Sequence, residues 1–482
     1  MRQSGFAQKK VSGTFKRCLE PYTLCKKRGV RASSRFQTPF LCIRHLFLGL
    51  VALGLSGLLA LAAFLPGAET YPPDGRSAGV EQATPDSESL PLPGDPRQQR
   101  AQHLARLGVS RWHTQGYRGQ GVKIAILDSG FRGYQTHLGR ALPAHVDVRA
   151  FRMDGNLEAK NSAHGILCSE VVHALAPEAE LLLVNWDAER PDQFLEAVRW
   201  ARGQGARILT CSLIMPSWSD GDGGGTIHAA LAGLLGRGTR PGDLLCFASA
   251  GNTAQRHWFG LFHAASDGFH EWQPGHEDNE LIPWSDEQVS VELCSQLGSC
   301  YDVLVADDTG RQVVAEAQAS PRDGRCCAVA RFKPLRSHAY RVRVRLLKGP
   351  AGPFHLVALG SGLHYATASG SIPFPADGPE VIAVGAVTCD GERTAYSSCG
   401  PNSARPKPDL VAPVPFPSLW RARPFSGTSA ASPQAAGLAA LVWSKHPDWT
   451  AAQVWTALRQ AAHDLGPPGH DYETGYGLIH LP

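Results

Sequence analysis

The stretch VKIAILDSG, residues 122–130, decides the fold of this 482-residue chain. An almost unbroken apolar run closed by Asp-Ser-Gly predicts a strand that is buried on both faces and ends at Asp128. Strands of this kind belong to parallel sheets, whose two faces are covered by helices. Four more runs have the same character: AELLLVNW (179–186), ARILTCSL (206–213), DLLCFASA (243–250) and EVIAVGAV (380–387).

The segments between these runs have helical periodicity, with apolar residues three and four positions apart. They are HGILCSEVVHAL (164–175), DQFLEAVRWARGQG (192–205) and TIHAALAGLLGRG (226–238). Alternating strands and helices with right-handed crossovers predict an α/β fold with a doubly wound, mostly parallel sheet. We expect this α/β domain in two parts, residues 101–256 and 359–482.

The alternation stops between residues 257 and 358, where only strand patterns occur. In YRVRVRL, residues 340–346, apolar residues alternate with three arginines, as in an antiparallel strand that is buried on one face. Short strands separated by Gly, Pro and Asp turns are typical of β-sandwiches. We therefore expect residues 257–358 to form a β-sandwich-like domain inserted into the α/β domain.

The N-terminal part of the chain predicts targeting segments rather than a folded domain. Residues 1–45 form a basic tail with eleven Lys or Arg and one acidic residue, and residues 46–65 are twenty residues without a charge. A run of this length spans a bilayer, and its basic flank predicts that everything after it lies outside the cytoplasm. Two interpretations stay open: an uncleaved membrane anchor, or a secretion signal read from a start codon placed too early. Residues 66–100, rich in Pro, Ser and Asp, are expected to be a linker.

The net charge of +4 comes from that basic tail, which leaves the rest of the chain at about −6. No basic stripe remains outside the tail, so the sequence does not predict nucleic-acid binding. A hydrophobic fraction of 43% with 19% charged residues excludes a disordered chain and a membrane protein with many spans. We expect a folded extracytoplasmic protein, anchored in the cytoplasmic membrane or secreted, and the sequence does not indicate its oligomeric state.

Nine of the twelve cysteines follow the apolar run, so at least one of them is expected to be a free thiol. The candidates for free thiols lie among apolar residues: Cys168, Cys211 and Cys246. Cys389 and Cys399 are placed to close a hairpin. Four cysteines of the β-rich segment are placed to form two bridges: Cys294, Cys300, Cys326 and Cys327. The pairing among these four stays open.

Two candidate catalytic residues lie at the ends of predicted elements. Asp128 ends the first strand, at the carboxyl edge of the parallel sheet, where doubly wound folds build their sites. His164 lies within Ser-Ala-His-Gly before an apolar helix, where small neighbours allow other backbone to approach closely. Taken singly, each has an ordinary structural explanation, a turn residue for Asp128 and a structural histidine for His164.

The segment FSGTSAASP, residues 425–433, is more specific, because it places Ser429 among small residues at the start of an Ala-rich helix. There the hydroxyl benefits from the helix dipole and lies beside free backbone N–H groups that can hold an oxyanion. Gly427 lets the chain turn. Asn252, the last residue of ASAGN, offers a neutral amide donor for the same oxyanion.

In the order Asp, His, Asn, Ser, these motifs resemble those of the subtilisin family of serine proteases. Besides LDSG, SAHG and FSGTSAASP, three further segments look like those of the family: SSCGP (397–401), KPDLVAP (407–413) and TGYGLIHL (474–481). The resemblance covers roughly the two parts expected to form the α/β domain.

Carried over to this chain, the resemblance implies a serine endopeptidase that hydrolyses peptide bonds of proteins through an acyl-enzyme. It assigns four roles: Ser429 as nucleophile, His164 as general base and then acid, Asp128 as orienter of the imidazole, and Asn252 as oxyanion donor. It also implies that an extended peptide lies beside Cys211-Ser212-Leu213, with Ser212, Leu213 and Gly251 as substrate-binding residues. The alternative is a catalytically silent module of the same fold that binds peptides at the cell surface.

Departures from the family pattern concern the cleft. Ile166 and Leu167 follow His164-Gly165 where the family has Thr and a small residue, and Ile214 replaces a Gly after Ser212-Leu213. A bulky residue at position 214 predicts an altered cleft beside the substrate strand. The β-rich segment, which follows Asn252 directly, is a candidate for substrate selection or for packing over the active site, and a purely structural role is the alternative. No cofactor or metal is predicted: the acidic loop 220–225 lacks the remaining ligands of a calcium site, although structural calcium is left open.

Overall fold

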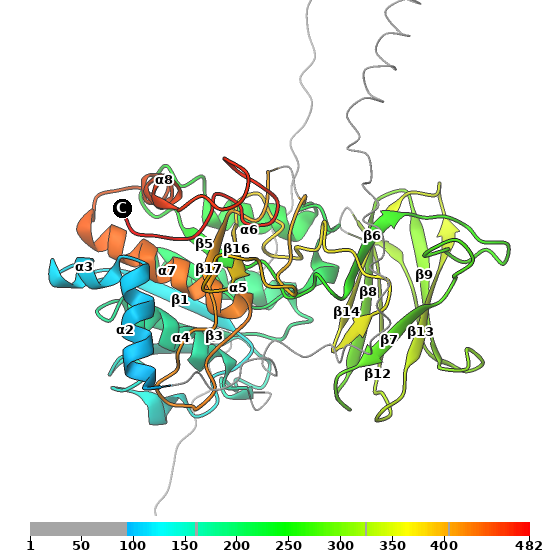
Figure 1. Ribbon diagram of the computed structural model, residues 1–482, viewed down its shortest axis with the longest axis horizontal. Helices are drawn as coiled ribbons and strands as arrows, with labels where there is room; N and C mark the ends of the chain where they lie inside the picture. The colour runs from blue at the N-terminus through cyan, green and yellow to red at the C-terminus, as the bar shows by residue number, and fades with distance from the viewer. Residues whose placement is uncertain (1–93, 160–161, 323–324, 403–404) are drawn as a thin grey trace, which may run out of the picture. The chain divides into compact units, whose positions relative to one another are not determined.

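A seven-stranded parallel sheet forms the centre of the α/β part in the computed structural model, which describes residues 94–159, 162–322, 325–402 and 405–482 (Figure 1). The strand order is β17-β16-β5-β4-β1-β3-β2. The strands are β1 Lys123–Asp128, β2 Asp147–Ala150, β3 Glu180–Asn185, β4 Ile208–Cys211, β5 Leu245–Ser249, β16 Ile382–Val387 and β17 Leu410–Pro413. Because the chain builds outward on one side of β1 and then on the other, the sheet is doubly wound, and the predicted α/β fold with a mostly parallel sheet is confirmed.

Helices cover both faces of this sheet. Side chains alternate along each strand, so each apolar strand presents apolar side chains to both faces, and both faces need cover. Ile124 and Ile126 of β1 point into one buried cluster, and Ala125 and Leu127 point into the other. The first cluster is closed by α2 Pro96–Arg106, α3 Val109–Thr114, α4 His164–Leu175, α7 Thr428–Lys445 and α8 Ala451–Ala461. The second is closed by α5 Pro191–Gly203 and α6 Thr226–Leu235, and two short 3-10 helices, η1 Tyr134–His137 and η3 Pro216–Trp218, lie in loops.

Helix α7 is buried on nearly all sides, and its Ala-rich composition explains how it fits there. Small side chains let it approach the sheet and α4 closely. A Cβ atom at Gly437 would lie 2.7 Å from the Cβ of Leu175, so glycine is required where α7 crosses α4. This close crossing brings the N-terminal ends of the two helices, which carry His164 and Ser429, to the same side of the sheet.

Helix α2 begins inside the stretch that was expected to be a linker. Asp95 caps it, with Oδ1 accepting a hydrogen bond from the Arg97 N–H at 3.0 Å, and Pro96 occupies the first helical position. Arg100 then pairs with the buried carboxylate of Glu170 in α4. Polar composition suggested a linker, but the Asp-Pro start signal and this ion pair order the segment.

Two five-stranded antiparallel sheets follow the first part of the α/β domain, with strand orders β10-β9-β13-β7-β15 and β11-β12-β8-β14-β6 (Figure 1). Their strands are β6 His257–Leu261, β7 Asn279–Pro283, β8 Val289–Gln296, β9 Cys300–Asp307, β10 Val313–Gln318, β11 Ser320–Arg322, β12 Arg325–Phe332, β13 Tyr340–Lys348, β14 Pro353–Leu359 and β15 Ser361–Leu363. The sheets end with β15 at Leu363, so the β-rich segment continues past residue 358, where the sequence predicts its end. Residues of both sheets share one hydrophobic core. Val342 and Val344 are fully buried in it, while the arginines between them lie on the outer face, as the alternation predicted.

The four cysteines of this segment lie in two pairs. Cys300 and Cys326 form a disulfide between β9 and β12. Cys294 and Cys327 lie opposite each other on β8 and β12, with their Sγ atoms 2.8 Å apart. Cys168, Cys211 and Cys246 are buried free thiols, whereas Cys389 and Cys399 are not joined to each other.

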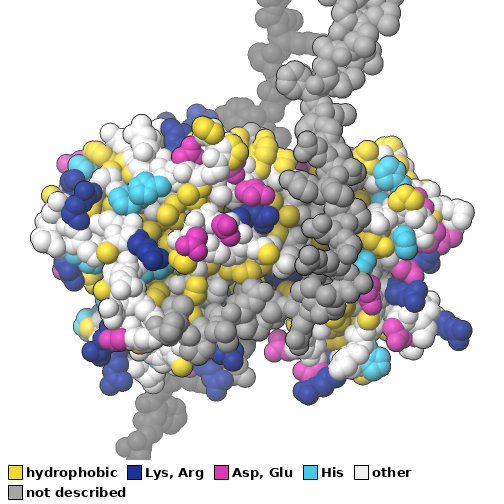
Figure 2. Space-filling view, in the orientation of Figure 1, with side chains coloured by type: hydrophobic (Ala, Val, Ile, Leu, Met, Phe, Trp, Pro, Cys, Tyr) yellow, Lys and Arg dark blue, Asp and Glu magenta, His cyan; other side chains and the backbone are white. Residues whose placement is uncertain are grey.

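Surface charges are mixed on the face shown in Figure 2. Among the described residues that are visible there, Lys and Arg side chains are interspersed with Asp and Glu, without a large patch of one sign. Exposed ion pairs such as Arg118–Glu178, at 2.8 Å, contribute little to stability because both partners remain solvated.

The predicted membrane span, residues 46–65, lies outside the described residues. Among the residues that are described, no helix combines the length and the apolar character needed to cross a bilayer.

Candidate active site

Asp128 is the last residue of β1, and its side chain is fully buried. After β3 the chain moves to the other side of β1, so the carboxyl end of β1 is the switch point of the sheet. One carboxylate oxygen, Oδ1, accepts hydrogen bonds from the N–H and the hydroxyl of Ser129, at 2.8 and 3.3 Å. The other, Oδ2, is left to face His164.

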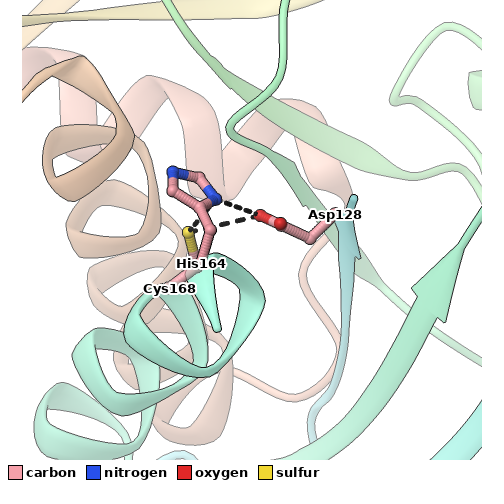
Figure 3. A group of neighbouring side chains, drawn as sticks. All are labelled: Asp128, His164 and Cys168. Atoms are coloured by element: carbon pink, nitrogen blue, oxygen red, sulfur yellow. Dashed lines mark hydrogen bonds and ion pairs between the residues drawn. The ribbon is translucent and has the colours of Figure 1, made fainter. Parts of the chain in front are cut away.

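His164 is the first residue of α4, and its Nδ1 lies 2.8 Å from Asp128 Oδ2 (Figure 3). Gly165 makes this placement possible, because a Cβ atom there would lie 2.4 Å from the ring of Phe131. The ring of Phe425 packs edge-on against the imidazole, at 5.5 Å between centroids. The imidazole remains 26% exposed, and its Nε2 points away from Asp128 in Figure 3, so that nitrogen is free to exchange a proton with a reactant.

The electrostatics of this pair favour a protonated imidazole. Burial by itself disfavours the charged ring, but the negative charge of Asp128 and the hydrogen bond to it outweigh burial and hold the pKa of His164 well above 6.5. An imidazole held in this way is a stronger base than a free one and has a fixed tautomer, with Nδ1 protonated toward Asp128.

Cys168 lies one helical turn after His164 and contacts the same pair (Figure 3). Its Sγ lies 3.6 Å from Asp128 Oδ2, 3.8 Å from His164 Nδ1 and 3.7 Å from the carbonyl oxygen of Ser429. Donor atoms of Asp128, His164 and Cys168 lie within 4.8 Å of one another, a spacing that a metal site also requires. Burial raises the pKa of the Cys168 thiol, which disfavours the thiolate that metals bind, so the geometry fits a neutral thiol packed under the Asp-His pair.

Ser429 is the second residue of α7, where the first backbone N–H groups of the helix have no partner within the helix. Its hydroxyl donates a hydrogen bond to the carbonyl oxygen of Ser212 at 3.2 Å. In return, the Ser212 hydroxyl donates to the Ser429 carbonyl oxygen at 3.1 Å. These two bonds tie the start of α7 to the end of β4.

Asn252 follows β5, and its side-chain oxygen Oδ1 accepts hydrogen bonds from the N–H and the hydroxyl of Thr428, at 3.0 and 2.9 Å. Its Nδ2 therefore faces away from Thr428. Gly427 has a φ of +84° and gives Nδ2 its room, because a Cβ atom there would lie 2.9 Å from Nδ2. The amide is thus oriented as a donor beside the start of α7.

The expected substrate-binding residues lie around Ser429. Ser212 contacts it directly, and Leu213, the next residue, is partly buried and packs against the second hydrophobic cluster. Gly251 is buried with a φ of +100°, and its N–H donates to the Thr428 hydroxyl at 3.2 Å. Ile214, the residue that departs from the family pattern, lines a cavity of about 590 Å³.

Three residues of the site were missed by the sequence reasoning. Cys168 was read only as a buried thiol, although its position four residues after His164 places both on one helix face. Thr428 is adjacent to the nucleophile, and its role is to donate hydrogen bonds to Asn252, which is distant in sequence. Arg256, the last residue of the first part expected for the α/β domain, donates from Nε to the carbonyl oxygen of Asn252 at 2.8 Å, and burial lowers its pKa to about 10.

Comparison with known proteins finds a family match for the C-terminal part of the chain, which contains Ser429. A family model described as the subtilase family matches residues 348–477. The chain is similar to subtilisin E of Bacillus subtilis (strain 168), with 36% identity over 155 residues that cover 28% of this chain and 38% of that protein. It is also similar to subtilisin of Bacillus pumilus, with 36% identity over 155 residues and 53% of that protein covered. The chain thus spans about half or less of the length of these curated relatives.

Among solved structures, the chain is similar to the CspB protease of Clostridium perfringens, with a TM-score of 0.57 and 17% identity. The likeness covers 79% of this chain and 96% of that chain. At this level of identity it concerns the fold alone.

Proposed function

We propose that this chain, which belongs to the subtilisin-like serine peptidases, hydrolyses peptide bonds of proteins through an acyl-enzyme formed on Ser429. The observation that carries the proposal is the position of Cys168 Sγ, which touches both His164 Nδ1 and the Ser429 backbone, at 3.8 and 3.7 Å. The shared contact supports the view that the Asp128–His164 pair and Ser429 act on one substrate.

The first chemical step uses the proton acceptor at His164. The Ser429 hydroxyl turns from the Ser212 carbonyl to His164 Nε2, gives up its proton there, and attacks the carbonyl carbon of the scissile bond. Asp128 keeps the imidazole in the tautomer that accepts this proton and stabilises the imidazolium that forms. His164 then returns the proton to the leaving amine, and a water molecule releases the acyl group by the same route.

The oxyanion that forms in this step needs donors that are in place beforehand. We assign Asn252 Nδ2 to it, together with the backbone N–H of Ser429, which belongs to the unpaired first turn of α7. The helix dipole of α7 adds a positive potential at the same place. The hydrogen bonds from Thr428 to Asn252 Oδ1 support this assignment because they fix the amide without using its donor group.

The substrate is an extended polypeptide, which we place along Ser212 and Leu213 with Gly251 on its other side. We further infer that residues 257–358 act as an inserted β-sandwich module next to this cleft, and that the enzyme works outside the cytoplasm. The first inference is supported by the separate hydrophobic core that the two antiparallel sheets enclose. The second is supported by the Cys300–Cys326 disulfide, since such bonds persist in oxidising compartments.

A fluorophosphonate probe tests the proposal, because it reacts only with an activated serine. Wild-type protein is expected to be labelled at Ser429, as shown by mass spectrometry of the labelled peptide, and the Ser429→Ala variant is expected to stay unlabelled. Ser432→Ala is a matched control in the same helix and should keep the label. A correctly folded wild-type protein that takes no label and cleaves no casein would instead support a silent peptide-binding module.

A further inference from the structure

The cavity beside Ile214 lies between the α/β part and the outer face of one antiparallel sheet. It has a volume of about 590 Å³, and its walls come from the loop before α5, from the segment that includes η3, and from β8 and β12. The charged residues that line it are Glu189, Glu292, Arg325 and Arg331.

The cavity lies on the path proposed for the substrate. Ser212 holds Ser429 through two hydrogen bonds, so the chain after Ser212 leads away from the nucleophile. Ile214 and Met215, the second and third residues along this path, both line the cavity. Because an extended chain advances about 3.3 Å per residue, a peptide that pairs with Ser212-Leu213 reaches the cavity a few residues from the scissile bond.

The polar wall of the cavity follows from strand alternation in β8 and β12. Val291 and Leu293 are fully buried in the core between the two sheets, so Ser290 and Glu292 point outward. Their partners in register on β12 are Arg331 and Val329, and Arg325 points to the same outer side. The side chains that a β-strand normally presents to water are therefore turned toward the α/β part.

Two of the charged residues already have partners. Glu292 accepts hydrogen bonds from the Ser217 N–H at 2.9 Å and from the Ser290 hydroxyl at 3.1 Å. Arg331 pairs with Glu189 at 3.4 Å, in a contact that is partly exposed. Neither residue requires a further ligand.

Arg325 differs from both of them. Only 7% of it is exposed, its Nη1 has no hydrogen-bond partner, and no carboxylate lies within ion-pair distance of its guanidinium in the part of the chain that the structure describes. A buried guanidinium is unfavourable unless an anion and hydrogen bonds compensate it, and its planar fork matches a carboxylate. The Arg325 guanidinium in the cavity can therefore bind a carboxylate.

We propose that this cavity is a substrate subsite that binds an Asp or Glu side chain of the polypeptide on the N-terminal side of the scissile bond, through Arg325. The inference rests on the proposed peptidase function and names the substrate class of that same site. The acidic side chain enters beside Ile214 and places its carboxylate on the guanidinium, so the β-rich segment selects the substrate.

Paired peptides that differ only in Glu or Gln, at each of the second to sixth positions before the cleaved bond, test this subsite. For wild-type protein, kcat/KM is expected to be on the order of tenfold higher with Glu than with Gln at one of these positions. A difference of this size corresponds to the free energy of one charge-assisted hydrogen bond. Arg325→Gln should remove this preference, so that kcat/KM becomes equal for the Glu and Gln peptides, while fluorophosphonate labelling of Ser429 shows that the variant folds. Arg331→Gln is the matched control, and it should keep the preference because Arg331 is already paired with Glu189.

The outcomes separate the two proposals. If wild-type protein cleaves the peptides with equal kcat/KM for Glu and Gln at every position, the subsite is overturned and the peptidase function stands. Loss of the preference in Arg331→Gln as well as in Arg325→Gln overturns the assignment to Arg325 in favour of a general charge effect. If no peptide is cleaved and Ser429 takes no fluorophosphonate label, the proposed function itself fails.

Discussion

The side-chain oxygen of Asn252 accepts two hydrogen bonds from Thr428, one from its N–H at 3.0 Å and one from its hydroxyl at 2.9 Å. Thr428 directly precedes the proposed nucleophile. The orientation of the amide is therefore tied to the residue next to Ser429, and the donor nitrogen of Asn252 is aimed without any contact from the substrate.

Asn252→Ala is expected to lower kcat by about 100- to 1000-fold while KM changes little, because the amide stabilises the oxyanion only in the transition state. Thr428→Val, which removes one of the two bonds to Oδ1, should lower kcat less. Steady-state kinetics on one peptide substrate measures both. If Asn252→Ala instead raises KM and leaves kcat unchanged, the amide binds the substrate in its ground state.

Gly427→Ala is expected to abolish most of the activity in a folded protein. The φ of +84° disfavours a side chain, and the added Cβ would lie 2.9 Å from Asn252 Nδ2 and displace the proposed oxyanion donor. Gly469→Ala is a suitable control, because it has a φ of +95° but no atom within 4 Å of the added Cβ. The idea is wrong if both variants keep wild-type kcat, as measured beside circular dichroism spectra of each.

The pH dependence of kcat/KM should follow the protonation of His164. Activity requires a neutral imidazole, so kcat/KM is expected to rise with pH through a pKa well above 6.5, to which Asp128 raises this group. Asp128→Asn removes that charge, and burial then lowers the pKa. The rise in activity should move to lower pH, while the maximum falls by a factor on the order of 10⁴ because the tautomer is no longer held. A profile that keeps its midpoint in Asp128→Asn would contradict the assignment.

Cys294 and Cys327 are expected to form a second disulfide when the protein meets a disulfide oxidant such as oxidised glutathione. Their Sγ atoms, 2.8 Å apart on directly paired strand positions, need only a small movement to reach the bonded distance of about 2.05 Å. The two thiols lose two protons and two electrons, and the oxidant is reduced to two thiols. Peptide mapping without reduction should show the linked pair, with Cys300–Cys326 as the internal reference. Alkylation of both Cys294 and Cys327 in the oxidised, denatured protein would contradict the prediction.

Much of the fold was predictable because its signals are local. The apolar run that ends at Asp128 corresponds to β1, and the periodic stretch 164–175 has the bounds of α4. The sequence does not predict the start of α2 at Pro96, because the segment is short and polar. The helix is held by an ion pair between Arg100 and Glu170, which is distant in sequence.

By itself, the sequence determined the elements and the residue types of the site, because hydrophobic periodicity and small-residue motifs act over a few neighbouring positions. Only the tertiary structure decided which partners those residues meet. Thr428 orients Asn252 and Arg325 meets the cavity beside Ile214 across separations of more than a hundred residues. Such contacts depend on strand register and on how two sheets pack, and both are properties of the whole folded chain rather than of any one segment.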